Sequence, residues 1–230
     1  MVFLPLHDKN ALRFIPFQRI TVGLIVTNIA VFYWQFTLSD PQSMALVLGG
    51  GLTPAALMGT ANIPVQYAWL PPEVTLFTHM FLHGSWLHLI SNMVFLWVFG
   101  DNVEDAMGHL KFLVFYLLCG MGAGFAHALM DPVSGVPLVG ASGATAGIIG
   151  AYLLLYPRVK VWVLLLLRIP LRLPAYWVLV SWLSFQIYFV LAEVKDSTAW
   201  WAHLGGFTLG VALTPLLKRR DVPLFGPTAP

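Results

Sequence analysis

The chain has 230 residues, of which 58% are hydrophobic and 10% are charged, and its formal net charge is +2. Soluble domains carry roughly 25% charged residues, so this composition excludes a soluble domain and predicts that most of the surface faces lipid. The small net charge gives no reason to expect a nucleic-acid partner. The single cysteine, Cys119, excludes an intrachain disulfide.

Six apolar stretches are predicted to cross the membrane, because a spanning helix needs about 20 predominantly apolar residues. In chain order they cover roughly residues 20–38, 85–103, 111–130, 142–157, 174–193 and 199–217. We therefore expect an all-α integral membrane protein with six transmembrane helices. The N-terminal segment does not resemble a cleavable signal peptide, because no small-residue cleavage site follows its apolar run.

Two connections between these spans are distinctive. Residues 39–84, between the first and second spans, are rich in proline and contain no lysine or arginine. We expect them to form a long structured loop that lies partly in the membrane interface. Residues 158–173 carry four basic residues around an apolar run that is too short to span, and we expect this segment to lie along the membrane surface.

The positions of the basic residues predict the orientation, because cytoplasmic loops carry an excess of lysine and arginine. With six spans, the N-terminal segment, the turn near Lys111, the 158–173 loop and the tail share one side and hold every basic residue except Lys195. We expect a six-span domain at 20–217 in the cell (inner) membrane. The segment at 1–19 and the tail at 218–230 are then both cytoplasmic.

Four polar side chains are predicted to meet in one thin layer of the membrane. Ser142 begins the fourth span, His203 lies near the start of the sixth, and His88 and Asn92 lie early in the second. All three spans descend from the outer face, so a rise of 1.5 Å per residue places the four side chains roughly 5–12 Å below the outer boundary. Polar groups in hydrocarbon are costly and commonly mark function.

Small residues recur every fourth position on the two spans that carry the serine and the sixth-span histidine. Gly143 and Gly147 lie on the fourth span, and Gly206 and Gly210 lie on the sixth. Such stripes let membrane helices approach backbone to backbone, which a hydrogen bond between the serine and the histidine needs. Ordinary helix packing explains the same stripes, and both interpretations can hold together.

These groups can perform acyl transfer. A serine hydroxyl needs an adjacent base, and His203 can take the proton of Ser142 during attack on a carbonyl and return it to the leaving amine. His88, the Asn92 amide and the backbone N–H of Ser142 can donate hydrogen bonds to the oxyanion. No carboxylate falls at the depth of His203, so we expect a dyad and not a triad. Hydrolysis also requires a wet cavity open to the outer face.

His79 and His83 are four residues apart and, with His88, are open to interpretation as a metal cluster. The sequence contains no His-Glu-x-x-His motif and no carboxylate near these histidines, so we expect no metal and no other cofactor. We expect His79 and His83 to organise the outer loop through hydrogen bonds.

At these residues the sequence resembles the rhomboid family of intramembrane serine proteases. The matching pieces are residues 83–92 (HGSWLHLISN), 140–143 (GASG) and 202–206 (AHLGG) followed by Gly210, while Glu104 fits the family's Glu-x-x-x-Gly. The pieces occur in the family's order, and the likeness covers roughly residues 20–217.

The resemblance implies a six-helix rhomboid-like bundle with a long outer loop between spans one and two. It implies that Ser142 is the nucleophile, that His203 is the base, and that His88 and Asn92 lie near the oxyanion. It also implies that the substrates are transmembrane helices of other membrane proteins, cut near the outer face of the lipid bilayer. The sequence carries no signature of oligomeric state.

Two positions depart from the family's pattern. Val74-Thr75 stands where many members have Trp-Arg, shortly before the Phe-Thr-His segment. Ala146 stands four residues after the serine, where many members have an aromatic residue that packs on the catalytic histidine. Another side chain is therefore expected to hold the His203 ring.

Two other classes of function stay open. An inactive rhomboid-like protein captures membrane helices without cutting them, and Ala146 is the feature that favours it, although such proteins usually lack the serine or the histidine. A small transporter or metal-binding membrane protein built on the histidines is the third alternative.

Overall fold

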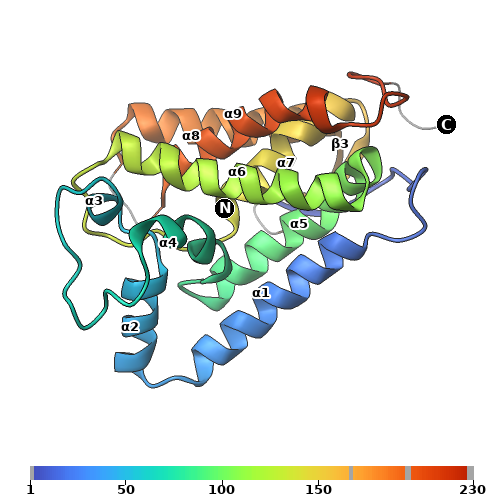
Figure 1. The fold of residues 1–230 in the computed structure, drawn as a ribbon. Helices are drawn as coiled ribbons and strands as arrows, with labels where there is room; N and C mark the ends of the chain where they lie inside the picture. The colour runs from blue at the N-terminus through green and yellow to red at the C-terminus, as the bar shows by residue number, and fades with distance from the viewer. Residues whose placement is uncertain (1–2, 166–167, 195–197, 227–230) are drawn as a thin grey trace.

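Long apolar stretches become helices in the computed structural model, which describes residues 3–165, 168–194 and 198–226 (Figure 1). Backbone N–H and C=O groups in hydrocarbon must be satisfied within the segment, and a helix does this. The six long helices are α1 (Arg19–Thr37), α5 (Trp86–Met107), α6 (His109–Met130), α7 (Ser142–Leu155), α8 (Ala175–Leu191) and α9 (Trp200–Leu217). Each of them lies on one of the predicted spans.

Several of these helices suit a membrane. By length and hydropathy, α1 and α6 can each cross one alone. α5 meets the same test together with the segment Pro72–Phe81, from which it is bent by 81°. α7 and α8 are apolar but shorter. The chain is thus a mostly helical protein with several membrane-suited helices.

Short helices fill the connection between α1 and α5. They are α2 (Asp40–Gly50), α3 (Pro54–Leu57), α4 (Pro72–Thr78) and the 3-10 helix η1 (His79–Phe81). The Thr78 hydroxyl donates to the Gly50 carbonyl over 2.6 Å. Leu52 and Leu138 exchange two backbone hydrogen bonds of 3.0 and 2.8 Å, which tie this connection to the loop between α6 and α7. The connection is therefore ordered, although it lacks the Trp-Arg pair discussed above.

Three antiparallel strands correct the expectation of an all-α chain. β1 (Phe3–Asp8), β2 (Lys160–Leu165) and β3 (Ile169–Pro174) form a sheet in the order β1-β2-β3. Along β2, Lys160 is exposed and Val161 is buried, and the same alternation repeats at the next two residues. This period of two is the pattern of a half-buried strand. The 158–173 segment therefore contains the antiparallel strands β2 and β3, and its position along the membrane surface stays a prediction.

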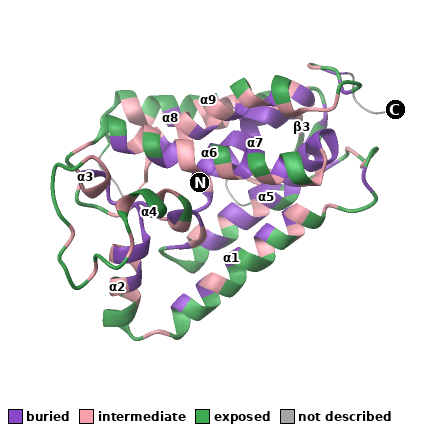
Figure 2. Cartoon of the chain, in the orientation of Figure 1, coloured by how far each residue is buried: buried purple, intermediate pink, exposed green. Residues whose placement is uncertain are grey.

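Helix α7 lies at the centre of the bundle, where it packs against α5, α6, α8 and α9 (Figure 2). Every residue from Gly143 to Tyr152 is buried. A Cβ built on Gly206 of α9 would lie 2.0 Å from the Gly143 carbonyl oxygen, and one on Gly210 would lie 2.1 Å from that of Gly147. No side chain fits in those gaps, so α7 and α9 touch through their backbones.

Buried carboxylates join the helix ends at one end of the molecule. Glu104, with 0% of its side chain exposed, accepts hydrogen bonds from the backbone N–H of Ile20 at 3.0 Å and of Thr21 at 2.8 Å. These donors lie in the first turn of α1, where no helix carbonyl is available to them, and a negative charge is favourable there. Asp105 accepts the N–H groups of residues 13–15.

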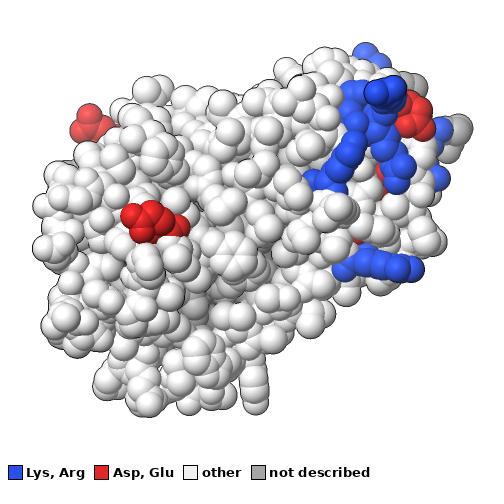
Figure 3. Space-filling view, viewed as in Figure 1, with Lys and Arg blue, Asp and Glu red and all other residues white. Residues whose placement is uncertain are grey.

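Basic side chains gather at this same end. On the face shown in Figure 3, the lysine and arginine side chains lie where α1 begins and α9 ends. Arg219, just after α9, donates its backbone N–H to the Ala106 carbonyl over 2.8 Å and its Nε to the Asp105 carbonyl over 3.2 Å. The chain's two terminal segments are therefore fastened to the turn between α5 and α6.

Candidate functional site

Four predicted site residues lie toward the end of the bundle opposite the basic end. The helices that carry them, α5, α7 and α9, all begin at that end (Figure 1). Ser142 is the first residue of α7, and His203 lies in the first turn of α9. His88 and Asn92 lie in the first two turns of α5. Three separate helices thus present polar side chains on one level.

Gly140 joins the α5 residues to the serine. Its φ of +122° is a backbone conformation that favours glycine. A Cβ built there would lie 2.7 Å from both Cε1 and Nε2 of His88 and 3.7 Å from the Asn92 amide nitrogen. The imidazole and the amide therefore rest directly on the backbone two residues ahead of Ser142.

Hydrogen bonds orient these groups. The Gly140 N–H donates to the His79 carbonyl over 2.8 Å, which holds the loop in place. The Asn92 amide donates to the His88 carbonyl over 3.1 Å, so its nitrogen lies on the His88 side. The N–H of Ser142 lies at a helix start, where no carbonyl of the helix is positioned to accept it. An imidazole, an amide and a backbone N–H can thus face one developing charge.

The close approach of α7 and α9 brings Ser142 and His203 onto adjoining turns. A Cβ on Gly143 would lie 3.7 Å from the Ala202 carbonyl oxygen, so the residues next to the serine and the histidine nearly touch. Ser142 and His203 are both partly exposed, whereas their neighbours Gly143 and Ala202 are buried. The backbones that carry Ser142 and His203 therefore lie close together at the edge of the core.

Helix α8 contributes a residue that the sequence reasoning missed. The Nδ1 atom of His203 lies 2.7 Å from Oε1 of Gln186, whose side chain is 5% exposed. The His203 ring centroid also lies 5.9 Å from that of Trp182 and 6.1 Å from that of Trp200. Ala146 is fully buried inside the bundle. The His203 ring is thus contacted by two side chains of α8 and by Trp200 of its own helix, α9.

A simple signal pointed to Gln186. The depth of a residue in a predicted span follows from a rise of 1.5 Å per residue. On this measure Gln186 lies roughly 10 Å below the outer end of the span at 174–193, in the same layer as the other four side chains. An amide can orient an imidazole as a carboxylate does, because its oxygen also accepts a hydrogen bond.

His79 and His83 bond through their backbones. The His79 carbonyl accepts the Gly140 N–H, and the His83 carbonyl accepts a 2.9 Å hydrogen bond from the Gln35 amide of α1. The His83 ring lies 5.2 Å from the ring of His88. Within the described ranges, no three His, Cys, Asp or Glu side chains are grouped as a metal site requires.

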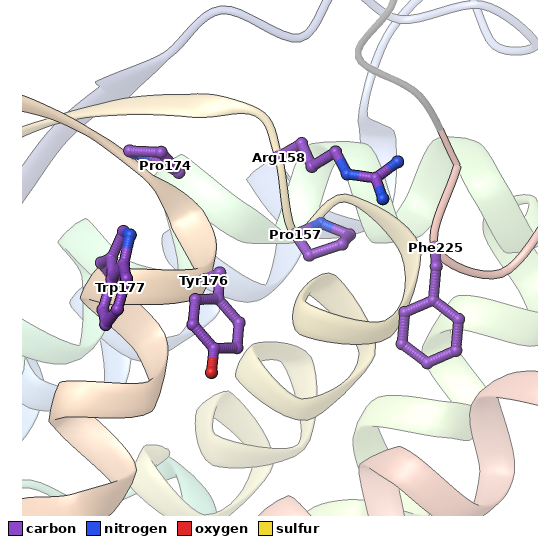
Figure 4. Close-up of a pocket in the computed structure, with 6 residues that line it drawn as sticks. All are labelled: Pro157, Arg158, Pro174, Tyr176, Trp177 and Phe225. Atoms are coloured by element: carbon purple, nitrogen blue, oxygen red, sulfur yellow. The ribbon is translucent and has the colours of Figure 1, made fainter.

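A pocket of about 450 Å³ lies away from these residues, at the other end of α7 (Figure 4). It opens between the segment that follows α7, the junction of β3 with α8, and the C-terminal tail. Its lining residues are Pro157, Arg158, Pro174, Tyr176, Trp177 and Phe225. The cavity is therefore separate from the Ser142 site.

Comparisons with known proteins agree on one family. The sequence model described as Rhomboid domain matches residues 72–220. Rhomboid protease AarA of Providencia stuartii is 28% identical over 165 residues, covering 64% of this chain and 54% of that protein. Rhomboid protease GlpG of Salmonella paratyphi A is 27% identical over 164 residues, covering 69% and 55%. The chloroplastic rhomboid-like protein 11 of Arabidopsis thaliana is 38% identical over 87 residues, covering 38% and 28%.

The matches span between 28% and 55% of the lengths of these three relatives. The matched family region contains the starts of α5, α7 and α9, so all four polar residues of the site lie within it.

Proposed function

Because this chain belongs to the rhomboid family, we propose that it is an intramembrane serine endopeptidase that uses a Ser142–His203 dyad. One observation carries the proposal: His88 and Asn92 rest on Gly140, two residues before a serine whose helix touches the histidine helix through its backbone. A serine, a base and several oxyanion donors from distant parts of the chain thereby share one small region.

The chemistry follows from these positions. His203 takes the proton of Ser142 as Oγ attacks the scissile carbonyl, and His88, Asn92 and the Ser142 N–H stabilise the oxyanion. His203 then gives the proton to the leaving amine as the C–N bond breaks. A water molecule attacks the acyl-enzyme, again through His203, and the second product leaves with Ser142 restored.

We propose that the protein crosses the cell (inner) membrane six times and that both termini are cytoplasmic. The basic residues at the end where α1 begins and α9 ends support this orientation (Figure 3). Helix α7 has 14 residues, so it is about 21 Å long, whereas the hydrocarbon layer is about 30 Å thick. A short central helix of this kind places Ser142 below the outer boundary while keeping it close to water.

The substrates that suit this site are transmembrane helices of other membrane proteins. A peptide bond inside a helix is shielded by its own hydrogen bonds, so the helix must unwind before Ser142 can attack. Unwinding is easiest near the outer end of a span, where freed N–H and C=O groups can bond to water. We therefore propose cleavage near the outer face.

The test is cleavage of single-span substrates in liposomes by the purified protein. We expect wild type to cut at least one member of a substrate panel, and we expect Ser142→Ala and His203→Ala to be inactive. Ser184→Ala is the matched control, because the Ser184 hydroxyl is exposed on α8 and donates to the Val180 carbonyl of its own helix. Cleavage that survives Ser142→Ala would reject the nucleophile. Wild type that binds the panel without cutting would instead identify a rhomboid-like protein that captures helices.

A further inference from the structure

The strongest unexplained feature of the site is a buried amide on a helix whose residues are mostly apolar. Gln186 is 5% exposed, and burial of an amide is costly unless it forms hydrogen bonds. Both ends of this amide are used: Nε2 donates to the Trp182 carbonyl over 3.2 Å, and Oε1 lies 2.7 Å from His203 Nδ1.

The Trp182 contact settles which way the amide points. A backbone carbonyl only accepts hydrogen bonds, so the group that faces it is the NH₂ of Gln186. The oxygen of the amide then faces the imidazole. Since this oxygen also only accepts, Nδ1 of His203 carries the proton. A neutral imidazole with its proton on Nδ1 has its basic lone pair on Nε2.

We propose that Gln186 is the positioning residue of His203: it holds the imidazole in the Nδ1–H tautomer, which presents Nε2 as the base for Ser142. This inference rests on the proposed function of the same site. It gives Gln186 the part that a buried aspartate plays in a Ser-His-Asp triad, but with a neutral group. No proton passes to Gln186 at any step.

The surroundings of the ring suit this role. Trp182 and Gln186 are four residues apart on α8, so they share one helix face, and both contact the same imidazole. Trp200 packs edge-on against the ring, with 87° between the two planes. With Ala146 in place of an aromatic residue on α7, the tryptophans and the amide limit rotation of the ring.

The neutral amide has a distinctive consequence for the pH profile. When His203 becomes a cation, a carboxylate beside Nδ1 would stabilise it more strongly than an amide does. Gln186→Glu should therefore move the acidic limb of the kcat/KM profile to higher pH. Gln186→Leu removes the acceptor at similar size, so it should move the limb to lower pH. His88 and His83 are further imidazoles near this layer, with rings 5.2 Å apart. His88 rests on Gly140 and not on α8, and both histidines are common to all variants.

The experiment compares pH profiles of kcat/KM for wild type, Gln186→Leu, Gln186→Glu and Ser184→Ala in liposomes. We expect Gln186→Leu to lose roughly tenfold or more in kcat, a part of the 10²–10⁴-fold contribution of a positioned base, with KM little changed. At pH values above its shifted acidic limb, Gln186→Glu should be more active than Gln186→Leu. Ser184→Ala should match wild type at every pH. Gln186→Leu with an unchanged profile, or Leu and Glu variants that shift the limb in the same direction, would overturn the proposal.

Nitrogen-15 NMR of histidine-labelled protein tests the tautomer without reference to turnover, with the His203 signal assigned from His203→Asn. We expect the proton on Nδ1 in wild type and a mixture of tautomers in Gln186→Leu. An Nε2–H tautomer in wild type would overturn the role of Gln186 but would still allow proteolysis by wild type. The proposed function would be rejected by a different result, namely wild type that cuts no substrate and does not react with a fluorophosphonate.

Discussion

Single residues decide whether the proposed oxyanion side of the site can form. Gly140 has no Cβ, and its absence lets His88 and Asn92 approach the chain two residues before Ser142. Its φ of +122° also turns the loop so that its N–H reaches the His79 carbonyl. Two separate requirements thus favour glycine at position 140: the lack of space for a Cβ and the positive φ.

Gly140→Ala should abolish most activity. The added methyl group would meet the His88 ring at 2.7 Å, and the unfavourable φ costs about 1–3 kcal/mol. Since loss of one oxyanion donor typically lowers turnover 10²–10³-fold, we expect a drop of about 100-fold in kcat, measured on a single-span substrate.

Two glycines provide matched controls for this variant. Gly135 lies in the same loop with open space around its Cβ position, so Gly135→Ala should be neutral. Gly59 has a φ of +70° but no neighbour within 4 Å, so Gly59→Ala isolates the backbone strain. If Gly140→Ala behaves like Gly59→Ala, with lower stability but full activity, the contact with His88 has no part in catalysis.

Asp8 gives the molecule a pH-dependent stability. This carboxyl, at the end of β1, is 5% exposed and accepts a hydrogen bond from the Tyr152 hydroxyl of α7. Burial raises its pKa from 3.8 to about 6, against smaller opposing effects of Tyr152 and His7. The folded protein therefore holds this proton more tightly than the unfolded chain. Its stability falls as the pH rises from about 4 to about 6 and is then level with respect to this group.

Asp8→Asn should remove this dependence, because the amide oxygen can still accept from Tyr152 but does not ionise. Between pH 4 and pH 7 the variant should gain about 2 kcal/mol relative to wild type, measured by chemical unfolding in detergent at each pH. A difference between variant and wild type that stays constant over this range would contradict the buried, pKa-shifted carboxyl.

At the scale of elements, the site depends on two helices that touch without intervening side chains. Gly206 and Gly210 of α9 lie against the backbone of α7 at Gly143 and Gly147. Backbone atoms of a packed helix cannot move aside as a flexible side chain can. Any larger residue must therefore push α9, and His203 with it, away from Ser142.

Gly206→Ala should separate the helices, since its Cβ would lie 2.0 Å from the Gly143 oxygen. We expect a loss of about 1–3 kcal/mol in unfolding free energy, as for other overpacked cores, together with at least a tenfold loss of activity. Gly23→Ala on α1 is the control, because nothing lies within 4 Å of that Cβ position and alanine favours helix. Equal stability and activity for the two variants would show that the α7–α9 contact is looser than described.

At the scale of the whole molecule, membership of the rhomboid family, predicted from three short motifs, is confirmed by the match over residues 72–220. The long helices were predictable because the requirement for long apolar helices leaves a strong sequence signal. The hairpin of β2 and β3 was missed because basic residues around a short apolar run were interpreted only as a segment that lies along the membrane surface. The alternating burial along β2 appears only in the structure, because every residue of the strand after Lys160 is apolar.

The site was only partly predictable, for a related reason. Depth along a span follows from counting residues, so Ser142, His203, His88 and Asn92 could be placed on one level. Which neighbour each side chain meets depends on helix rotation and packing, which counting does not give. The contact of Gln186 with His203 and the fit of His88 against Gly140 therefore emerged only from the fold.

The proposed orientation can be tested by cysteine labelling of right-side-out vesicles. The native Cys119 is fully buried, so it gives no background. Gly135→Cys, in the loop between α6 and α7, should react with a membrane-impermeant maleimide, whereas Asp221→Cys, in the tail, should react only after the vesicles are opened. Both positions are exposed. The opposite pattern would invert the topology and place Ser142 near the cytoplasm.

Activation of Ser142 by His203 is tested most directly by a fluorophosphonate, which reacts only with a nucleophilic serine, with the adduct located by mass spectrometry. We predict a single adduct on the peptide that contains Ser142, with a labelling rate at least 100-fold lower in His203→Ala, in keeping with the contribution of a general base. An adduct on a different serine, or a rate unaffected by His203→Ala, would contradict the dyad.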